Sequence, residues 1–206
     1  MATTWPALGW TLEHLSEVTG EQRLQFRLGK MQPEKTPQFE TDCRYILATL
    51  HQFTRWCAGD HGETVGPFLD LDPVDTWAYA DYKYLAVLFP GNHQFLQGLV
   101  WSDFGYLGRD GRQSTLWIGS DGAGTPCHQD TYGSNLVLQI QGRCVHYDFQ
   151  RAKHSFVLVL FLCFVSCWRI GILEVHQHWE CNLFMVLAIA HIIFMKDNMG
   201  SLTSTN

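Results

Sequence analysis

Residues Trp117–Gly142 read WIGSDGAGTPCHQDTYGSNLVLQIQG, and the fold can be predicted by working outward from this stretch. It is entered by Ser114–Ile118 (STLWI), whose β-branched and aromatic side chains favour a strand. Gly119–Gly124 is rich in glycine and predicts a connection. Asn135–Gln141 alternates strictly between two faces, which predicts a second strand ending at the following glycine. The apolar residues of one face are Leu136, Leu138 and Ile140. The stretch therefore indicates a mainly β domain.

Between these strands lies His128-Gln129-Asp130, a histidine and an aspartate two residues apart. On an extended backbone such side chains point to the same face, so they offer neighbouring positions to one metal ion. Two histidines and one carboxylate on one face of an octahedron are typical of non-haem iron(II) oxygenases. The spacing alone is not specific, and a loop histidine beside a solvated aspartate is the alternative. Similar pairs occur at His61-Gly62-Glu63, His146-Tyr147-Asp148 and His178-Trp179-Glu180.

The order of residues around the pair is more specific than the pair itself. T-P-x-H-x-D is followed by an asparagine that opens an alternating strand ending in Q-I-x-G. This order resembles the JmjC-type iron(II)/2-oxoglutarate oxygenases. TWAYADYKY, WSDFGYLGRDGRQSTLWIG and TPCHQDTYG are similar to segments of JmjC proteins that associate with small heat-shock proteins. The resemblance covers roughly residues 5–143. It implies an α+β fold, mainly β with N-terminal helices, whose double-stranded β-helix (jelly roll, cupin-like) is incomplete at the C-terminus.

The resemblance also implies roles for individual residues. His128 and Asp130 would bind iron(II), and Thr125, Asn135 and Tyr84 would line the 2-oxoglutarate pocket. Taken without the resemblance, Thr125 is a turn residue, Asn135 caps the start of a strand and Tyr84 belongs to the core. The implied reaction is hydroxylation of a C–H bond, with a protein as the expected substrate. The implied partner is a small heat-shock protein.

Two parts of the family's apparatus are missing from this sequence. Relatives usually have a lysine at the end of the Asn135 strand, where it pairs with the distal carboxylate of 2-oxoglutarate. Here the run is Gly142-Arg143-Cys144, and Arg143 is expected on the opposite face of the strand. The later strand with a W-W-H-type motif and the third iron ligand is also absent, and His176 and His178 are interpreted as incidental. The sequence therefore predicts an impaired enzyme.

Three functions stay open on these residues. The first is an oxygenase, which iron-dependent turnover of 2-oxoglutarate would favour. The second is a non-catalytic protein that binds a small heat-shock protein, which partner binding by an inert chain would favour. The third is a membrane-tethered fragment. The sequence argues against a serine hydrolase and a dinucleotide-binding enzyme, because neither G-x-S-x-G nor G-x-G-x-x-G occurs.

The N-terminal half predicts helices and short strands. Thr11 is expected to cap a helix that ends at Gly20, and Gln25–Leu28 to form a strand. Thr41–Trp56 has apolar residues at intervals of one, three and four and predicts a helix. Ala78–Phe89 is compatible with a strand or a helix. Further expectations are a loop at Pro33 and Pro37 and a short helix at Phe95–Val100.

Composition restricts the class of protein. The net charge is −6 and no basic block occurs, which argues against a dedicated nucleic-acid binder. Seven cysteines without a CxxC pair favour reduced thiols over a disulfide framework. The N-terminus has no basic start followed by an apolar core, so no signal peptide is expected. We expect a cytoplasmic or nuclear protein.

The chain changes character near residue 144, which predicts a boundary between residues 1–143 and an apolar tail at 144–206. The tail contains the uncharged runs Ser155–Trp168 and Cys181–Met195. Neither alternates, so neither is expected to be a half-buried strand. A membrane hairpin and a buried core element are two interpretations, although both runs are shorter than the ~20 residues of a spanning helix. The favoured interpretation is an alternative C-terminus that is not part of the domain.

Overall fold

The chain forms a mixed α/β structure built on one mostly antiparallel sheet, as seen in a computed structural model. The structure describes residues 5–31, 38–128, 136–146, 156–161, 169–174 and 177–189. The helices are α1 (Leu12–Thr19), α2 (Leu50–Cys57), α3 (Leu85–Leu88) and α4 (His93–Leu96). The strands are β1 (Arg23–Lys30), β2 (Arg44–Thr49), β3 (Thr76–Tyr84), β4 (Ser114–Gly119), β5 (Ala123–His128), β6 (Leu136–His146), β7 (Phe156–Phe161), β8 (Arg169–Glu174) and β9 (Gln177–Ile189). Short 3₁₀ helices span Pro6–Gly9, Glu40–Asp42, Glu63–Phe68, Trp101–Phe104 and Gly111–Gln113. The expected combination of a β-rich sheet and N-terminal helices is confirmed.

Helix α1 forms where its capping signals predict it. The Thr11 hydroxyl accepts a hydrogen bond from the His14 backbone N–H at 3.1 Å, which satisfies a free donor of the first turn. Gly20 ends the helix with φ of 52°, a left-handed conformation that suits glycine. Leu12 and Leu15 on its inner face are buried. The strand expected next at Gln25–Leu28 is also confirmed, within β1.

The helix expected over Thr41–Trp56 is wrong in its first half. Arg44–Thr49 is strand β2, which pairs antiparallel with β1, and only Leu50–Cys57 is helical. Thr49 begins α2 with a capping box: its hydroxyl accepts from the Gln52 N–H at 3.1 Å, and the Gln52 side chain accepts from the Thr49 N–H at 3.0 Å. The apolar spacing across this junction looked helical by coincidence, because pairing with β1 is not visible locally.

The ambiguous segment Ala78–Phe89 contains both kinds of element. Its first part lies in β3 and its second part forms α3. The short helix expected at Phe95–Val100 lies slightly earlier, as α4, because the Asn92 side chain caps it by accepting from the Phe95 N–H at 3.0 Å. The loop expected at Pro33 and Pro37 falls outside the described residues.

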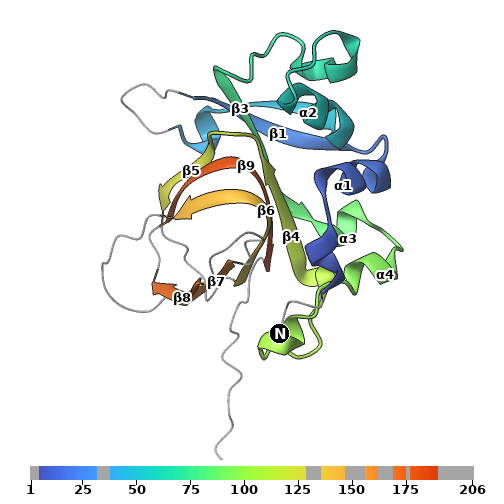
Figure 1. Ribbon diagram of the computed structural model, residues 1–206, viewed down its shortest axis with the longest axis vertical. Helices are drawn as coiled ribbons and strands as arrows, with labels where there is room; N and C mark the ends of the chain where they lie inside the picture. The colour runs from blue at the N-terminus through green and yellow to red at the C-terminus, as the bar shows by residue number, and fades with distance from the viewer. Residues whose placement is uncertain are drawn as a thin grey trace, which may run out of the picture.

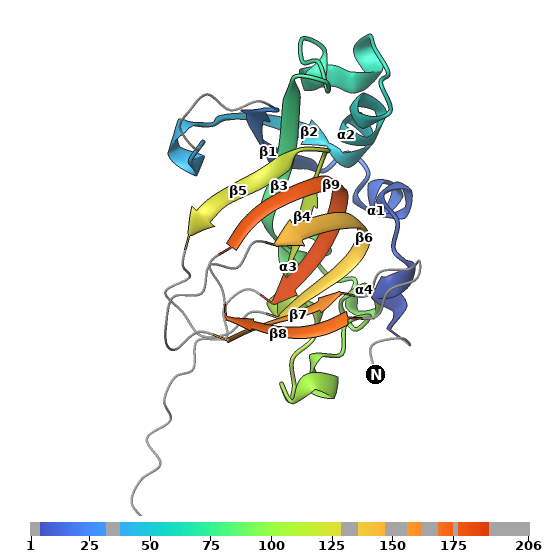
Figure 2. The same ribbon diagram turned by 60° about the vertical axis from the view of Figure 1, so that its left-hand side comes forward.

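The sheet follows the order β2-β1-β3-β4-β9-β6-β7-β8, and β5 pairs with β9. Every pairing is antiparallel except that of β6 with β7. Strand β9 pairs with β5 and β6 in its first half and with β4 and β6 in its second half. In Figures 1 and 2 this long strand curves, so that β5, β6 and β9 lie on one side of β3 and β4 while α1 and α2 lie on the other.

The two strands expected from the decisive stretch are confirmed as β4 and β6. Leu138 and Ile140 of β6 pack toward the main hydrophobic core, as the alternation predicts. The opposite face is covered as well, because Val137 and Gln139 are each 3% exposed. Strand β6 also runs across the boundary expected at residue 143, which stays a prediction.

The two uncharged runs of the tail, which were not expected to be half-buried strands, contain strands in the parts that the structure describes. The first run contains β7, and β9 extends through the second run as far as Ile189. An uninterrupted apolar run is also typical of a strand covered on both faces, which alternation cannot reveal. No helix within the described ranges is long and apolar enough to cross a membrane. The remainder of both runs lies outside those ranges.

The core lies between the helices and one face of the sheet. Phe26 of β1 stacks on Phe53 of α2, with ring centroids 4.9 Å apart, and meets Phe68 edge-on at 5.5 Å. Ala78 and Ala80 of β3 and Ile118 of β4 are completely buried on the same side. Burying each large apolar side chain stabilises the fold by roughly 1.5–3 kcal/mol, so this layer holds the helices on the sheet. The other face is left for polar groups.

Candidate functional site

The face of the sheet opposite the helices contains a buried charged cluster. Phe26 and Leu28 of β1 face the core, so Arg27 between them points to the other side. Its cross-strand neighbours are Tyr45 of β2 and Tyr79 of β3. Trp77 lies on the same face, where its ring occupies the space that a side chain at Gly29 would need: a Cβ there would lie 2.0 Å from the ring. Glycine at position 29 therefore leaves room for the Trp77 ring, which lies at one side of the cluster.

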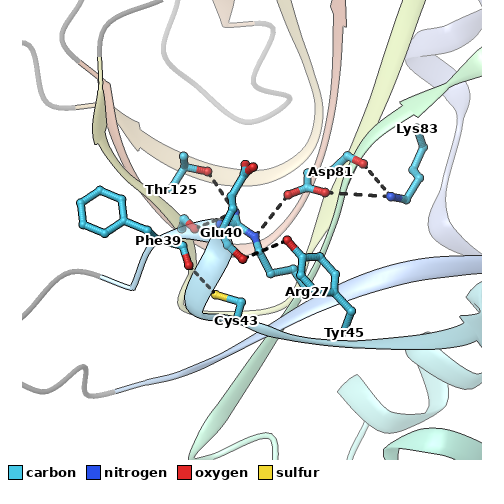
Figure 3. A network of polar contacts seen from close by, with 9 residues as sticks. Arg27, Phe39, Glu40, Cys43, Tyr45, Asp81, Lys83 and Thr125 are labelled. Carbon is cyan, nitrogen blue, oxygen red and sulfur yellow. Dashed lines mark hydrogen bonds and ion pairs between the residues drawn. The ribbon is translucent and has the colours of Figure 1, made fainter.

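Arg27 is the centre of this cluster, and it is 0% exposed. Nη2 donates to the Gly124 carbonyl and to the Thr125 hydroxyl, both at 3.3 Å, which joins β1 to β5 across 97 and 98 positions of sequence. Nε lies 3.2 Å from Oδ2 of Asp81, without the alignment of a hydrogen bond. Nη1 has no hydrogen-bond partner among the residues that the structure describes. Figure 3 shows Asp81 and Thr125 on two sides of the guanidinium.

Aromatic rings cover the guanidinium. Its central carbon lies 5.3 Å from the ring centroid of Tyr79 and 5.6 Å from that of Trp77. Such contacts stabilise a buried cation by roughly 1–2 kcal/mol. The Tyr79 hydroxyl hydrogen-bonds the Thr125 side chain, and burial raises the pKa of Tyr79 well above its usual value. Tyr79 therefore stays protonated and can donate a hydrogen bond.

Asp81 and Lys83 follow a bulge in β3. The register with β4 shifts between Ala80 and Lys83, and Tyr82 between them has φ of 51°. A residue other than glycine in this region is strained, and bulges redirect side chains. The Lys83 ammonium donates to the Asp81 carbonyl at 2.7 Å and lies 3.9 Å from its carboxylate.

Burial dominates the acid–base behaviour of this pair. It raises the pKa of the Asp81 carboxyl, although the charges of Arg27 and Lys83 act in the opposite direction. Burial likewise lowers the pKa of the Lys83 ammonium, against the attraction of Asp81. Arg27 and Lys83 thus face one buried carboxylate. Because burial disfavours the charged form of Asp81, that carboxylate neutralises the charge of Arg27 less completely.

The rim of the cluster consists of the chain before β2 and of β2 itself. The Cys43 thiol donates to the Phe39 carbonyl at 3.3 Å, and the Tyr45 hydroxyl donates to the Glu40 carbonyl at 3.2 Å (Figure 3). Burial raises the pKa of Cys43, while the nearby Arg27 guanidinium lowers it in part. Burial also raises the pKa of Tyr45. Both groups are therefore neutral at physiological pH.

The structure brings one of the five expected site residues into this cluster. Thr125 is partly exposed in β5 and contacts Arg27 and Tyr79. His128 ends β5, and its backbone pairs with Gln177 of β9, beside His178. The side chain of His128 is outside the description, as are Asp130 and Asn135 entirely.

Tyr84 lies elsewhere on β3. It is 46% exposed and pairs with Thr115 at the end of the strand, whereas Tyr79, five residues earlier, pairs with Gly119. Five strand residues span roughly 16 Å, so Tyr79 rather than Tyr84 is the tyrosine next to Thr125. The role expected for Tyr84 stays a prediction.

The expected metal centre also stays a prediction. The described residues contain no group of three histidine, cysteine or acidic side chains that could bind a metal ion. For 2-oxoglutarate the fit is better, because the Thr125 and Tyr79 hydroxyls lie beside a buried guanidinium, a donor set that suits a carboxylate. Arg143, the residue weighed as the replacement cation, is in β6, but its side chain is outside the description.

Sequence reasoning missed Arg27, Tyr79 and Asp81. A signal for Arg27 existed, because Leu24, Phe26 and Leu28 alternate in β1 and place Arg27 on the opposite face. The burial of that face had no local signal, because it depends on β5 from nearly 100 residues later. Asp81 was hidden in the acidic-aromatic run of β3 for the same reason.

Comparison with known proteins gives homologues for most of the chain. HSPB1-associated protein 1 homolog of Danio rerio is 56% identical over 143 residues, which are 69% of this chain and 32% of the relative. HSPB1-associated protein 1 of Bos taurus is 52% identical and that of Homo sapiens 50% identical, each over 69% of this chain and 29% of the relative. The chain thus spans about a third of the length of these relatives. No family model matches the chain. Over 69% of its length, the chain is therefore homologous to proteins named HSPB1-associated protein 1.

Proposed function

We propose that this chain associates with a small heat-shock protein. The observation that supports the proposal is its 50–56% identity to proteins named for association with HSPB1. Identity at this level preserves the fold of the matched residues. The proposal places the chain in the cytoplasm or nucleus and requires no catalysis.

A surface on β2 suits this function. β2 is the outermost strand of its end of the described sheet, and Tyr45 and Leu47 on it are 40% and 54% exposed. Phe39, just before the strand, is 53% exposed. An edge strand with exposed apolar side chains offers backbone hydrogen bonds and apolar contacts to a partner strand.

The experiment is a binding titration of the full chain with purified HSPB1. Leu47→Lys is expected to weaken binding at least tenfold, because it places a charge in the apolar contact. Leu107→Lys is the matched control, since Leu107 is 84% exposed and lies far from β2 in the sequence. If neither variant changes the affinity, the contact lies elsewhere than on β2. If the wild-type chain does not bind HSPB1, the proposal is refuted.

A second function is supported by the surroundings of Thr125. We propose that the fold is a partial double-stranded β-helix of the JmjC type, in which His128 and Asp130 hold iron(II), and Thr125 and Asn135 line the 2-oxoglutarate pocket. Tyr79, next to Thr125, takes the place in that pocket that the sequence suggested for Tyr84. When bound, iron(II) and 2-oxoglutarate would activate dioxygen, which would supply the oxygen atom for hydroxylating a C–H bond of a protein. The buried donors around Thr125 support the co-substrate part of this proposal. Cys144, which stands where the family usually has a lysine, predicts weak activity.

The test of this second function is an iron(II) titration followed by a turnover assay for 2-oxoglutarate. Micromolar iron binding that His128→Ala with Asp130→Ala abolishes, together with turnover, would establish an oxygenase. Site-dependent binding without turnover would fit an impaired enzyme. Iron binding that is the same in the variant would refute the site.

A further inference from the structure

The guanidinium of Arg27 lacks a full set of partners for a buried cation. A buried guanidinium has five N–H donors, and each one without a partner costs free energy. Nη2 makes two long bonds to neutral oxygens, and Nη1 makes none within the described part of the chain. Asp81 approaches only from the side of Nε. The Cys43 thiol also interacts with the guanidinium, but it is neutral. Among the described residues, the Nη1–Nη2 edge, which pairs with carboxylates in bidentate geometry, therefore has no anionic hydrogen-bond partner.

The charges around this edge favour an anion. Arg27 and Lys83 are two cations, and Asp81 is the buried carboxylate between them. Glu40 is near but exposed, so solvent screens its charge. Cys43, Tyr45 and Tyr79 are neutral because burial raises the pKa of each group. The cluster can accept one more negative charge without repulsion from a second buried carboxylate among the described residues.

The neutral groups beside the edge suit a carboxylate rather than a larger anion. The Thr125 hydroxyl lies 3.3 Å from Nη2, and the Tyr79 hydroxyl bonds Thr125. The guanidinium edge and the Thr125 hydroxyl, which Tyr79 holds in place, match the two oxygens of a carboxylate. The rings of Trp77 and Tyr79 restrict the space. Thr125 is partly exposed, so the guanidinium of Arg27 is separated from the surface by this one side chain.

We propose that Arg27 is the cation that binds the distal carboxylate of a small dicarboxylic acid, with the Thr125 hydroxyl, held by Tyr79, completing the site. Arg27 thereby takes the part of the lysine that the resemblance predicts in β6, where this sequence has Cys144. The inference rests on the second proposed function for the identity of the ligand as a 2-oxo dicarboxylate. The carboxylate site itself requires no metal.

The experiment compares 2-oxoglutarate with 2-oxopentanoate, which has the same carbon chain without the distal carboxylate. Binding of each to the full chain is measured by calorimetry with manganese(II) present. The wild-type chain is expected to prefer 2-oxoglutarate by roughly 10- to 100-fold, the range for a charge-assisted hydrogen-bond pair. Arg27→Gln should remove this preference. Arg55→Gln, which removes a half-exposed guanidinium paired with Asp60, should keep it.

A second variant and a metal-free readout cover the case in which Arg27→Gln does not fold. Thr125→Val keeps the volume and the charge of the cluster and should lower the preference several-fold. Without metal, succinate should shift the NMR resonance of the Arg27 Nε–H in the wild-type chain. This readout is independent of the proposed iron ligands, so a failed metal site leaves it unchanged.

The outcomes separate the proposals. Equal affinity for the two acids, or a preference that survives Arg27→Gln, would overturn the role of Arg27. Where that variant does not fold, no succinate shift together with an unchanged preference in Thr125→Val would overturn it. An Arg27-dependent preference without iron-dependent turnover would support the carboxylate site and count against the oxygenase alone.

Discussion

Phe26 and Arg27 are consecutive residues of β1, and both are 0% exposed, yet they are buried in opposite environments. Phe26 packs among the rings of Phe53 and Phe68 under the helices. Arg27 lies on the other face, where β5 covers it and Asp81 approaches it. Burying the Phe26 ring stabilises the fold, because it removes apolar surface from water. Burying the Arg27 guanidinium costs free energy unless each of its polar groups finds a partner. One face therefore stabilises the fold, and the other holds a buried charge that needs polar partners.

The largest effect is expected on the apolar face. Phe26→Ala should lower the free energy of unfolding by about 3–5 kcal/mol, because it opens a cavity between two aromatic rings. Urea unfolding followed by circular dichroism measures this change. Phe39→Ala removes a side chain that is 53% exposed, so its change should stay within about 0.5 kcal/mol. Equal losses in the two variants would mean that Phe26 is not part of a packed core.

A smaller effect is expected on the charged face. Asp81→Asn should lower the free energy of unfolding by about 1.5–3 kcal/mol, because it removes the carboxylate that faces buried Arg27. Asp60→Asn weakens the ion pair with Arg55, whose side chain is 50% exposed, and should cost at most about 1 kcal/mol. Chemical denaturation of the two variants provides the comparison. A neutral Asp81→Asn would indicate that Arg27 is compensated by another group.

The two faces should also differ in the chemistry of their thiols. Burial raises the pKa of Cys57 in α2 from 9.0 to about 12, while Cys43 lies at the charged rim. Because the raised pKa belongs to the folded state, its contribution is fully present below pH 9.0 and is lost as pH rises toward 12. Stability should fall with a slope approaching about 1.4 kcal/mol per pH unit in that window.

Alkaline unfolding of Cys57→Ala measures that slope by difference from the wild-type chain. Peptide mapping after alkylation at pH 8 provides an independent check, in which Cys43 should react before Cys57. Equal reactivity of the two thiols, or an unchanged slope in the variant, would contradict the burial of Cys57 in the native state.

The smallest effect concerns the junction at which β2 becomes α2. Thr49→Ala should lower the free energy of unfolding by about 1 kcal/mol, because it removes one half of the capping box with Gln52. Thr64→Ala is the control, since its hydroxyl makes one exposed bond at 3.5 Å to the His61 carbonyl. A thermal unfolding midpoint that shifts equally in both variants would show that the capping box does not stabilise α2.

Much of the local structure was predictable from the residues. Thr11 and Gly20 define the ends of α1, and the alternation of Leu136–Gln141 defines the core of β6. These predictions succeeded because capping and side-chain alternation depend on neighbours within a few positions. The T-P-x-H-x-D order also drew attention to Thr125, which the structure places against Arg27, while its role in a site stays a prediction.

Tertiary contacts decided the rest. Arg44–Thr49 is a strand because β1 pairs with it, and the apolar tail contributes β9 because β4, β5 and β6 provide partners for it. Arg27 becomes a candidate ligand-binding residue only when β5 folds over it and the bulge at Tyr82 places Asp81 beside it. Local patterns determine which face of an element a side chain occupies. What meets that face is set by long-range pairing, since burial and partners come from segments that are distant in the sequence.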